Sequence, residues 1–145
     1  MKFPAKFSLA VQILCICYKY KGKKITGNFI AEHTGSDSSF IRHTIFDLKK
    51  NNYLASNRGP GGTTLTCDLS TITLYDVYNR VADINDSILK FPALPDSASP
   101  LDISIRESTE TVFKGIKEEY LQILKTTTVM DICKNIQNIQ PESNK

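Results

Sequence analysis

The sequence lacks a long apolar run, and it has few residues of the types that build metal or disulfide sites. A helix that spans a bilayer needs about 20 consecutive apolar residues, whereas the apolar stretch 9–17 is short and interrupted by Gln12. No small-residue cleavage pattern follows this stretch, so we interpret it as a buried first helix rather than a signal peptide. We therefore expect no membrane association and a cytoplasmic location.

Cysteine is scarce and irregularly spaced, with residues at 15, 17, 67 and 133. A chain of 145 residues can build its own core, so a disulfide framework is not expected. Cys15 and Cys17 point to different sides of a helix, which does not suit a shared metal ion, and buried thiols behave as small apolar groups. Cys67 and Cys133 remain candidate redox-sensitive thiols.

Catalytic patterns are also missing. We find no paired carboxylates, nucleophile motif, phosphate-binding loop or cluster of metal ligands. Gly59-x-Gly61-Gly62 lies between two expected strands rather than before a helix, so it is not a dinucleotide-binding fingerprint. The sequence therefore predicts a protein that is not an enzyme and that uses no cofactor and no metal.

Charge is distributed unevenly along the chain. Residues 1–66 hold ten Lys and Arg against three Asp and Glu, a net charge of +7, and residues 67–145 hold eight against twelve, a net charge of −4. A basic front half is suited to an anionic polymer, while the mildly acidic back half is suited to a protein partner.

Three helices are expected in the front half. Residues 8–20 are apolar nearly all round and predict a central helix. Thr26 can cap a second helix over residues 27–33, and Ser36 or Asp37 can cap a third that runs to about residue 50.

The third helix has two faces. Ile41, Ile45 and Leu48 recur at helical spacing and should face the core. A second face carries Ser39, Arg42, His43 and Phe46, with Ser38 also in the first turn. Short polar residues in the first turn of such a helix can contact phosphates or base edges, and Arg42 can pair with guanine. This placement is typical of a DNA recognition helix.

A glycine-rich segment follows this helix. Residues 53–57 and 63–67 predict two short strands, and between them lies Arg58-Gly59-Pro60-Gly61-Gly62. Glycines permit positive φ and close approach to a sugar-phosphate surface. Arg58 would be well placed for a narrow minor groove. Together with the preceding helices, this hairpin predicts a winged helix.

The back half predicts a dimerisation arm. A helix over 74–81 capped by Thr73 is followed by a proline-containing linker, and a long amphipathic helix then runs from about residue 104 to 125 before a short helix over 129–136. A lone helix beyond a linker cannot bury its apolar stripe, so we expect it to pair with a second chain. The expected stripe is Val112, Phe113, Ile116, Tyr120, Ile123 and Leu124.

The expected fold is therefore mostly α with a small β-hairpin, a winged helix-turn-helix plus a long C-terminal dimerisation helix. We divide the chain into a DNA-binding domain (1–84), a linker or sensor loop (85–103), a dimerisation helix with a short C-terminal helix (104–136) and a flexible tail (137–145).

The residues resemble the winged-helix regulators typified by IscR, NsrR and CymR over almost the whole chain. The most specific match is Leu54-x-Ser56-x-Arg58-Gly59-Pro60-Gly61-Gly62, which is similar to the wing signature of that family. The resemblance implies a homodimer that binds a near-palindromic operator and represses transcription. It also implies a set of DNA contacts: Asp37, Ser38, Ser39, Phe40, Arg42, His43 and Arg58. Gly59 and Gly61 are added to the expected contacts because glycines permit close approach to DNA. Asp37 serves equally well as a helix N-cap.

One departure from the family concerns the cofactor. Many members hold an iron–sulfur cluster with three cysteines in the loop before the dimerisation helix, but residues 85–105 contain neither cysteine nor histidine. Thiolates are the usual cluster ligands, so this chain resembles the cluster-free branch. Such members sense a small molecule, thiol oxidation or a protein partner. A different class of function stays open, in which the winged helix is a protein-interaction module that does not bind DNA.

Overall fold

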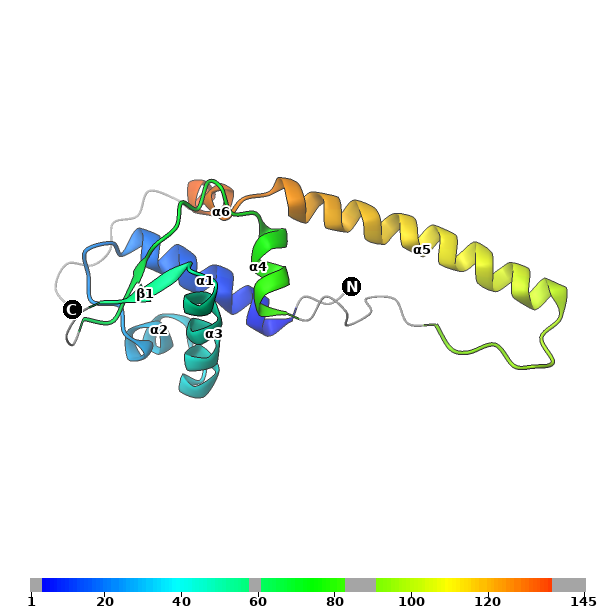
Figure 1. The fold of residues 1–145 in the computed structure, drawn as a ribbon, viewed down its shortest axis with the longest axis horizontal. Helices are drawn as coiled ribbons and strands as arrows, with labels where there is room; N and C mark the ends of the chain where they lie inside the picture. The colour runs from blue at the N-terminus through cyan, green and yellow to red at the C-terminus, as the bar shows by residue number, and fades with distance from the viewer. Residues whose placement is uncertain (1–3, 58–60, 83–90, 137–145) are drawn as a thin grey trace.

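The computed structural model describes residues 4–57, 61–82 and 91–136. Within these ranges the chain forms six helices and a two-stranded antiparallel sheet. In chain order they are α1 (Ala5–Lys19), α2 (Gly27–Thr34), α3 (Ser38–Lys50), β1 (Leu54–Ser56), β2 (Thr63–Leu65), α4 (Leu74–Val81), α5 (Pro100–Thr126) and α6 (Val129–Asn135). This confirms the predicted fold class of a mostly helical protein with a small hairpin (Figure 1).

Helix α1 forms the centre of the body. It packs against α2, α3, α4, α6 and β2, and Ile13 and Leu14 are completely buried. The ring of Phe7 meets Tyr78 of α4 edge-on at 5.2 Å between centroids. A helix surrounded in this way is apolar on most sides, and its exposed polar residues Ser8, Gln12 and Lys19 are confined to one narrow face. Both Cys15 and Cys17 are buried in this core, as predicted.

Short polar side chains set where the helices begin. Thr26 accepts a hydrogen bond from Phe29 N, and the Asp37 carboxylate accepts hydrogen bonds from Ser39 N and Phe40 N. Capping boxes start the later helices, with Thr73 and Asp76 at α4 and Thr128 and Asp131 at α6. These side chains satisfy backbone N–H groups that have no partner inside the helix. The predicted starts of α2, α3, α4 and α6 are confirmed.

Helix α5 begins earlier than predicted. Ser99 and Asp102 form a capping box and Pro100 occupies the first turn, so the helix starts at Pro100 and not near residue 104. A proline at the first helical position is favourable because its missing N–H would have no partner there. Pro100 was interpreted as part of the linker, but it belongs to the helix start.

Most of α5 projects away from the body (Figure 1). Its C-terminal end contacts α4, where Leu124 is buried, and the chain then turns into α6 against α1. In the described part of the chain, no helix has the length and apolarity that crossing a membrane requires.

Candidate nucleic-acid interface

Helix α3 separates its residues between core and surface. Ile41, Thr44 and Leu48 are fully buried and Ile45 is nearly so, and the Thr44 hydroxyl donates to Phe40 O at 2.8 Å. The opposite side leaves Ser38, Ser39, Arg42 and His43 exposed. The predicted inward face is confirmed, and the polar side chains of the other face are accessible.

Two of the residues that the family resemblance implied as DNA contacts have roles inside the fold. The Asp37 carboxylate accepts the two N–H bonds that start α3, so it acts as the N-cap. Phe40 is half-buried and packs against the core. The exposed remainder of the expected set on α3 is Ser38, Ser39, Arg42 and His43.

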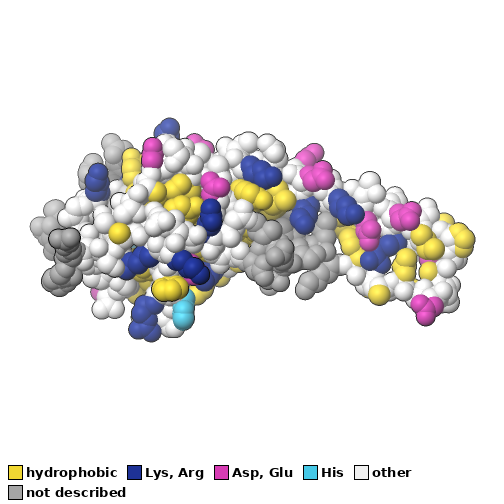
Figure 2. All heavy atoms as spheres, viewed as in Figure 1, with side chains coloured by type: hydrophobic (Ala, Val, Ile, Leu, Met, Phe, Trp, Pro, Cys, Tyr) yellow, Lys and Arg dark blue, Asp and Glu magenta, His cyan; other side chains and the backbone are white. Residues whose placement is uncertain are grey.

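The lysines near α3 differ in whether they form polar contacts within the chain. Lys6 forms an ion pair with Asp47, which ties α1 to α3. Lys49 donates to the Ser56 hydroxyl at 2.6 Å and ties α3 to β1. Lys50 is exposed in the last turn of α3. Basic side chains, a histidine and a hydrophobic side chain gather at the lower edge of the body, over α2 and α3 (Figure 2).

The hairpin lies beside α3 and is fixed to the segment before α2. Strands β1 and β2 pair antiparallel with Ser56 opposite Thr63, and Thr63 N donates to Ile25 O at 2.8 Å. At the base of the turn Asn57 donates from its side chain to Gly61 O at 2.7 Å and from its backbone to Gly62 O at 2.9 Å. The expected contacts Arg58 and Gly59 lie outside the described residues.

Gly62 is required by the protein's own packing. Its φ is +72°, and an added Cβ would lie 2.3 Å from Ile25 O. Both the backbone conformation and the contact therefore exclude a side chain. The sequence suggested that the glycines serve close approach to DNA, but the approach that the structure shows at Gly62 is to the backbone of Ile25.

A hollow of about 390 Å³ lies between the start of α2, the outer side of α3 and the start of β2. Arg42, Phe46 and Lys49 line it from α3, and Thr26 and Gly27 line it from the other side. Two cations at one hollow next to the exposed face of α3 form a surface suited to phosphate.

Cys67 and Cys133, the candidate redox-sensitive thiols, lie in different environments. Burial and the neighbouring Asp68 carboxylate raise the pKa of Cys67 to about 11, and its thiol lies 3.5 Å from Tyr53 O. A raised pKa lowers the thiolate fraction, which is the reactive form. Cys133 is buried, with its sulfur 3.5 Å from that of Cys15 in α1. The sequence gave no sign of this pair, since the two residues lie 118 positions apart.

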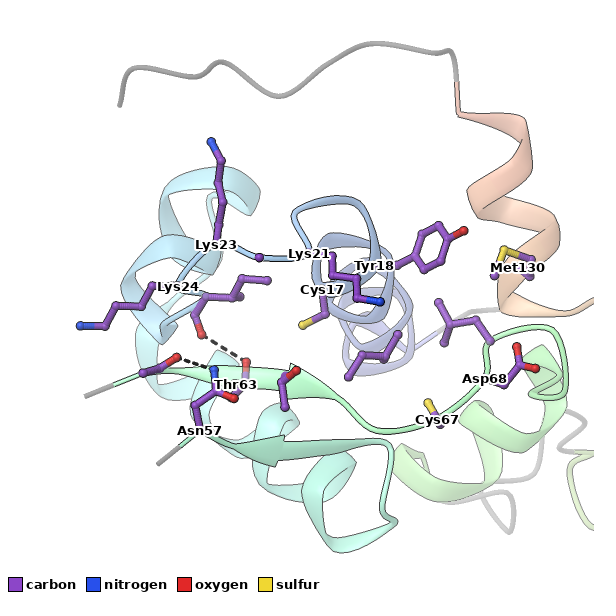
Figure 3. A pocket seen from close by; sticks show the side chains of 16 residues that line it. Cys17, Tyr18, Lys21, Lys23, Lys24, Asn57, Thr63, Cys67, Asp68 and Met130 are labelled. Carbon is purple, nitrogen blue, oxygen red and sulfur yellow. Dashed lines mark hydrogen bonds between the residues drawn. The ribbon is translucent and has the colours of Figure 1, made fainter. Parts of the chain in front are cut away.

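Two further hollows are large enough for a small molecule. One of about 620 Å³ lies between the end of α1, the loop after it, β2 and α6. In Figure 3, Cys17 and Cys67 point toward this hollow while Lys23 and Lys24 point away from it. Another of about 510 Å³ lies between residues 91–95 and α5, where Phe91, Ile105 and Arg106 contribute to its wall.

The apolar residues of α5 form two stripes rather than one. At about 100° per residue, Leu101, Ile105, Val112, Ile116 and Ile123 fall within an arc of about 60°, and all five are exposed. We call these five residues the α5 seam.

The second stripe consists of Phe113, Tyr120 and Leu124, which contact other residues of the same chain. Leu124 is 3% exposed and Tyr120 packs against the core. Phe113 lies beside Phe91 with 5.8 Å between ring centroids. Leu124, which the sequence pattern placed in the dimerisation stripe, is buried within one chain, whereas Leu101 and Ile105, which lay outside that stripe, are exposed.

Helices α2, α3 and α4 pack around the buried helix α1, and the hairpin contacts α3. This arrangement defines a winged helix-turn-helix, a fold in which the helix at the position of α3 is presented for DNA recognition. The profile of the Rrf2 family, described as an iron-dependent transcriptional regulator, matches residues 3–135. The chain therefore belongs to the Rrf2 family of transcriptional regulators.

Individual relatives agree with this assignment. A Bacillus subtilis protein named as an HTH-type transcriptional regulator, YwnA, is 23% identical over 88% of this chain and 96% of its own length. The oxidised form of Staphylococcus aureus CymR has the same fold, with a TM-score of 0.71 at 17% identity over 95% of this chain and all of that chain. IscR from T. potens gives a TM-score of 0.70 at 20% identity over 99% of this chain and 94% of that chain.

Because the family description refers to iron, we consider which side chains of this chain could ligate it. Among the described residues, no group of three or more His, Cys, Asp and Glu side chains is placed to hold a metal ion. In the sequence, the loop before α5 offers no cysteine or histidine. The residues present therefore do not fit the thiolate ligation that iron–sulfur clusters use.

Proposed function

We propose that this Rrf2-family regulator is a homodimeric, sequence-specific DNA-binding repressor that acts on a near-palindromic operator. The observation that carries the proposal is the surface of α3, whose inner face is locked in the core while Ser38, Ser39, Arg42 and His43 are exposed. A helix that is held rigidly by its buried side can present its N-terminal residues to base edges in the major groove. The net charge of +7 over residues 1–66 favours the polyanion.

Dimerisation is proposed through the α5 seam. Five exposed aliphatic residues in one arc of a projecting helix form an apolar surface that monomeric proteins rarely leave in water. A second copy of the same helix offers the complementary surface, and a two-fold dimer matches the symmetry of a near-palindromic site.

The signal is proposed to be a small molecule, a redox change or a protein partner, without the standard iron–sulfur site. The two hollows of about 620 and 510 Å³ support a small-molecule effector because they fall in the size range of ligand sites. The raised pKa of Cys67 speaks against that residue as a fast redox sensor. Membership of a family of transcriptional regulators favours DNA binding over a winged helix that serves only as a protein-interaction module.

The wing contact is tested with Arg58→Ala. If Arg58 enters a minor groove, its loss weakens binding to a selected duplex by about tenfold, measured by fluorescence anisotropy. Lys134→Ala is the matched control, since Lys134 is an exposed cation on α6, on the opposite side of the body from α3 (Figure 1). Equal affinities of the two variants would contradict the wing contact.

A further inference from the structure

Phe46 is unusual among the side chains on the outer face of α3. It is 65% exposed, although the same helix buries its other apolar residues to a large extent. Among the described residues of α2, α3 and the hairpin, no other large hydrophobic side chain is comparably exposed. A phenyl ring that stays in water on folding gains no burial free energy from the fold, so it remains available to a partner.

The position of Phe46 places it among the proposed base contacts. At about 100° per residue, Arg42, Phe46, Ser39 and His43 span an arc of about 100° on α3, and Phe46 lies inside that arc. Its distance along the axis from Ser39 is about 10 Å, seven residues at 1.5 Å each. A helix that lies in the major groove with Arg42 and His43 toward the bases presents Phe46, one turn beyond Arg42 on the same face, to the groove as well.

The chemistry of the ring restricts what it can contact there. A phenyl group has no hydrogen-bond donor or acceptor, so it cannot satisfy a phosphate oxygen or the polar edges of adenine, guanine and cytosine. Thymine alone offers an apolar group in the major groove, its C5-methyl. A protein partner is less well supported, because an apolar protein interface needs a contiguous patch and Phe46 is flanked by Arg42 and Lys49.

We infer that Phe46 is a specificity-determining residue that packs on the C5-methyl of a thymine in each operator half-site. The inference rests on the proposed DNA-binding function and deepens it. Loss of the ring removes the preference for thymine at that position while leaving the contacts of Arg42, His43 and the wing in place.

The experiment compares thymine with deoxyuridine, which lacks only the methyl group. A duplex is first selected from random DNA by the purified full-length protein. Thymines inside the protected region are then replaced by deoxyuridine, and affinities are measured by fluorescence anisotropy for the wild type, Phe46→Ala and Phe46→Leu. Duplexes with deoxyuridine only outside the protected region serve as controls. Thermal unfolding confirms that the variants fold, as expected for an exposed residue.

The affinity of the wild type should fall about fourfold per half-site when thymine is replaced by deoxyuridine. This is the equivalent of one buried apolar carbon. Phe46→Ala should bind both duplexes equally, and Phe46→Leu should retain part of the difference. Restoring thymine at single positions then identifies the base that Phe46 reads.

Three results would overturn the inference, and they are distinguishable. If the wild type binds both duplexes equally, the ring lies against sugar or solvent. If deoxyuridine lowers the affinity of Phe46→Ala as much as that of the wild type, another residue contacts the methyl group. If no duplex is selected at all, the proposed DNA binding fails and the inference fails with it.

Discussion

At the scale of single residues, hydrogen bonding separates the side chains that serve the fold from those that remain available to a partner. Asp37 and Ser39 are both exposed, yet the Asp37 carboxylate accepts two N–H bonds that start α3. Lys6 and Lys49 are engaged by Asp47 and Ser56. These polar contacts position α3, and the exposed residues beside them are the ones that mutation of the DNA interface should address.

Arg42→Ala should weaken binding to a selected duplex by about 1–3 kcal/mol and relax the base preference at one position, because a bidentate pair with guanine is lost. Thermal stability should stay unchanged, since Arg42 is exposed. Anisotropy titrations against duplexes with each base at that position provide the measurement. A variant that keeps both affinity and base preference would show that Arg42 does not read a base.

Cys67 should react slowly with alkylating agents. Its pKa of about 11, raised chiefly by burial, compares with an ordinary value of 9.0. Below pH 9 its thiolate fraction is therefore roughly 100-fold smaller in the folded chain than in the unfolded chain. Iodoacetamide labelling at pH 8, followed by peptide mass spectrometry with and without denaturant, compares the two rates. Equal rates would restore Cys67 as a candidate redox thiol.

At the scale of elements, the hairpin depends on its contact with the segment before α2. Gly62→Ala introduces a Cβ at 2.3 Å from Ile25 O on a residue with φ of +72°. The substitution should lower the free energy of unfolding by about 2 kcal/mol or more. Denaturant titration measures the change, and Gly115→Ala is the control, because an added Cβ at Gly115 meets no atom within 4 Å. A Gly62→Ala protein as stable as the wild type would contradict this packing.

Helix α5 should carry the dimer contact on its seam. Ile116→Asp places a carboxylate in the proposed apolar interface and should weaken the dimer by roughly 100-fold or more. Ile103→Asp is the matched control, since Ile103 is exposed on the opposite side of the same helix. Sedimentation velocity of wild type and both variants gives the oligomeric state. A dimer that survives Ile116→Asp, or a wild type that is monomeric, would contradict the seam.

At the scale of the whole molecule, local sequence signals predicted the elements and tertiary contacts decided their details. Caps such as Thr26 and Thr73 set helix starts by local hydrogen bonds, so they were predictable from sequence. The burial of Leu124 depends on how α5 meets α4. Position 62 requires a glycine because its backbone lies against that of Ile25, 37 positions earlier in the sequence. Neither is visible in a local pattern, and neither is the approach of Cys15 to Cys133.

The central claim, DNA recognition by a dimer, is tested most directly by selecting genomic fragments with purified protein and measuring the salt dependence of binding. The account predicts a near-palindromic site whose affinity falls by about 10³-fold or more between 50 and 200 mM salt, because Lys and Arg release counterions from several phosphates in each half-site. Selection that enriches no fragment, or binding that salt does not weaken, would contradict it.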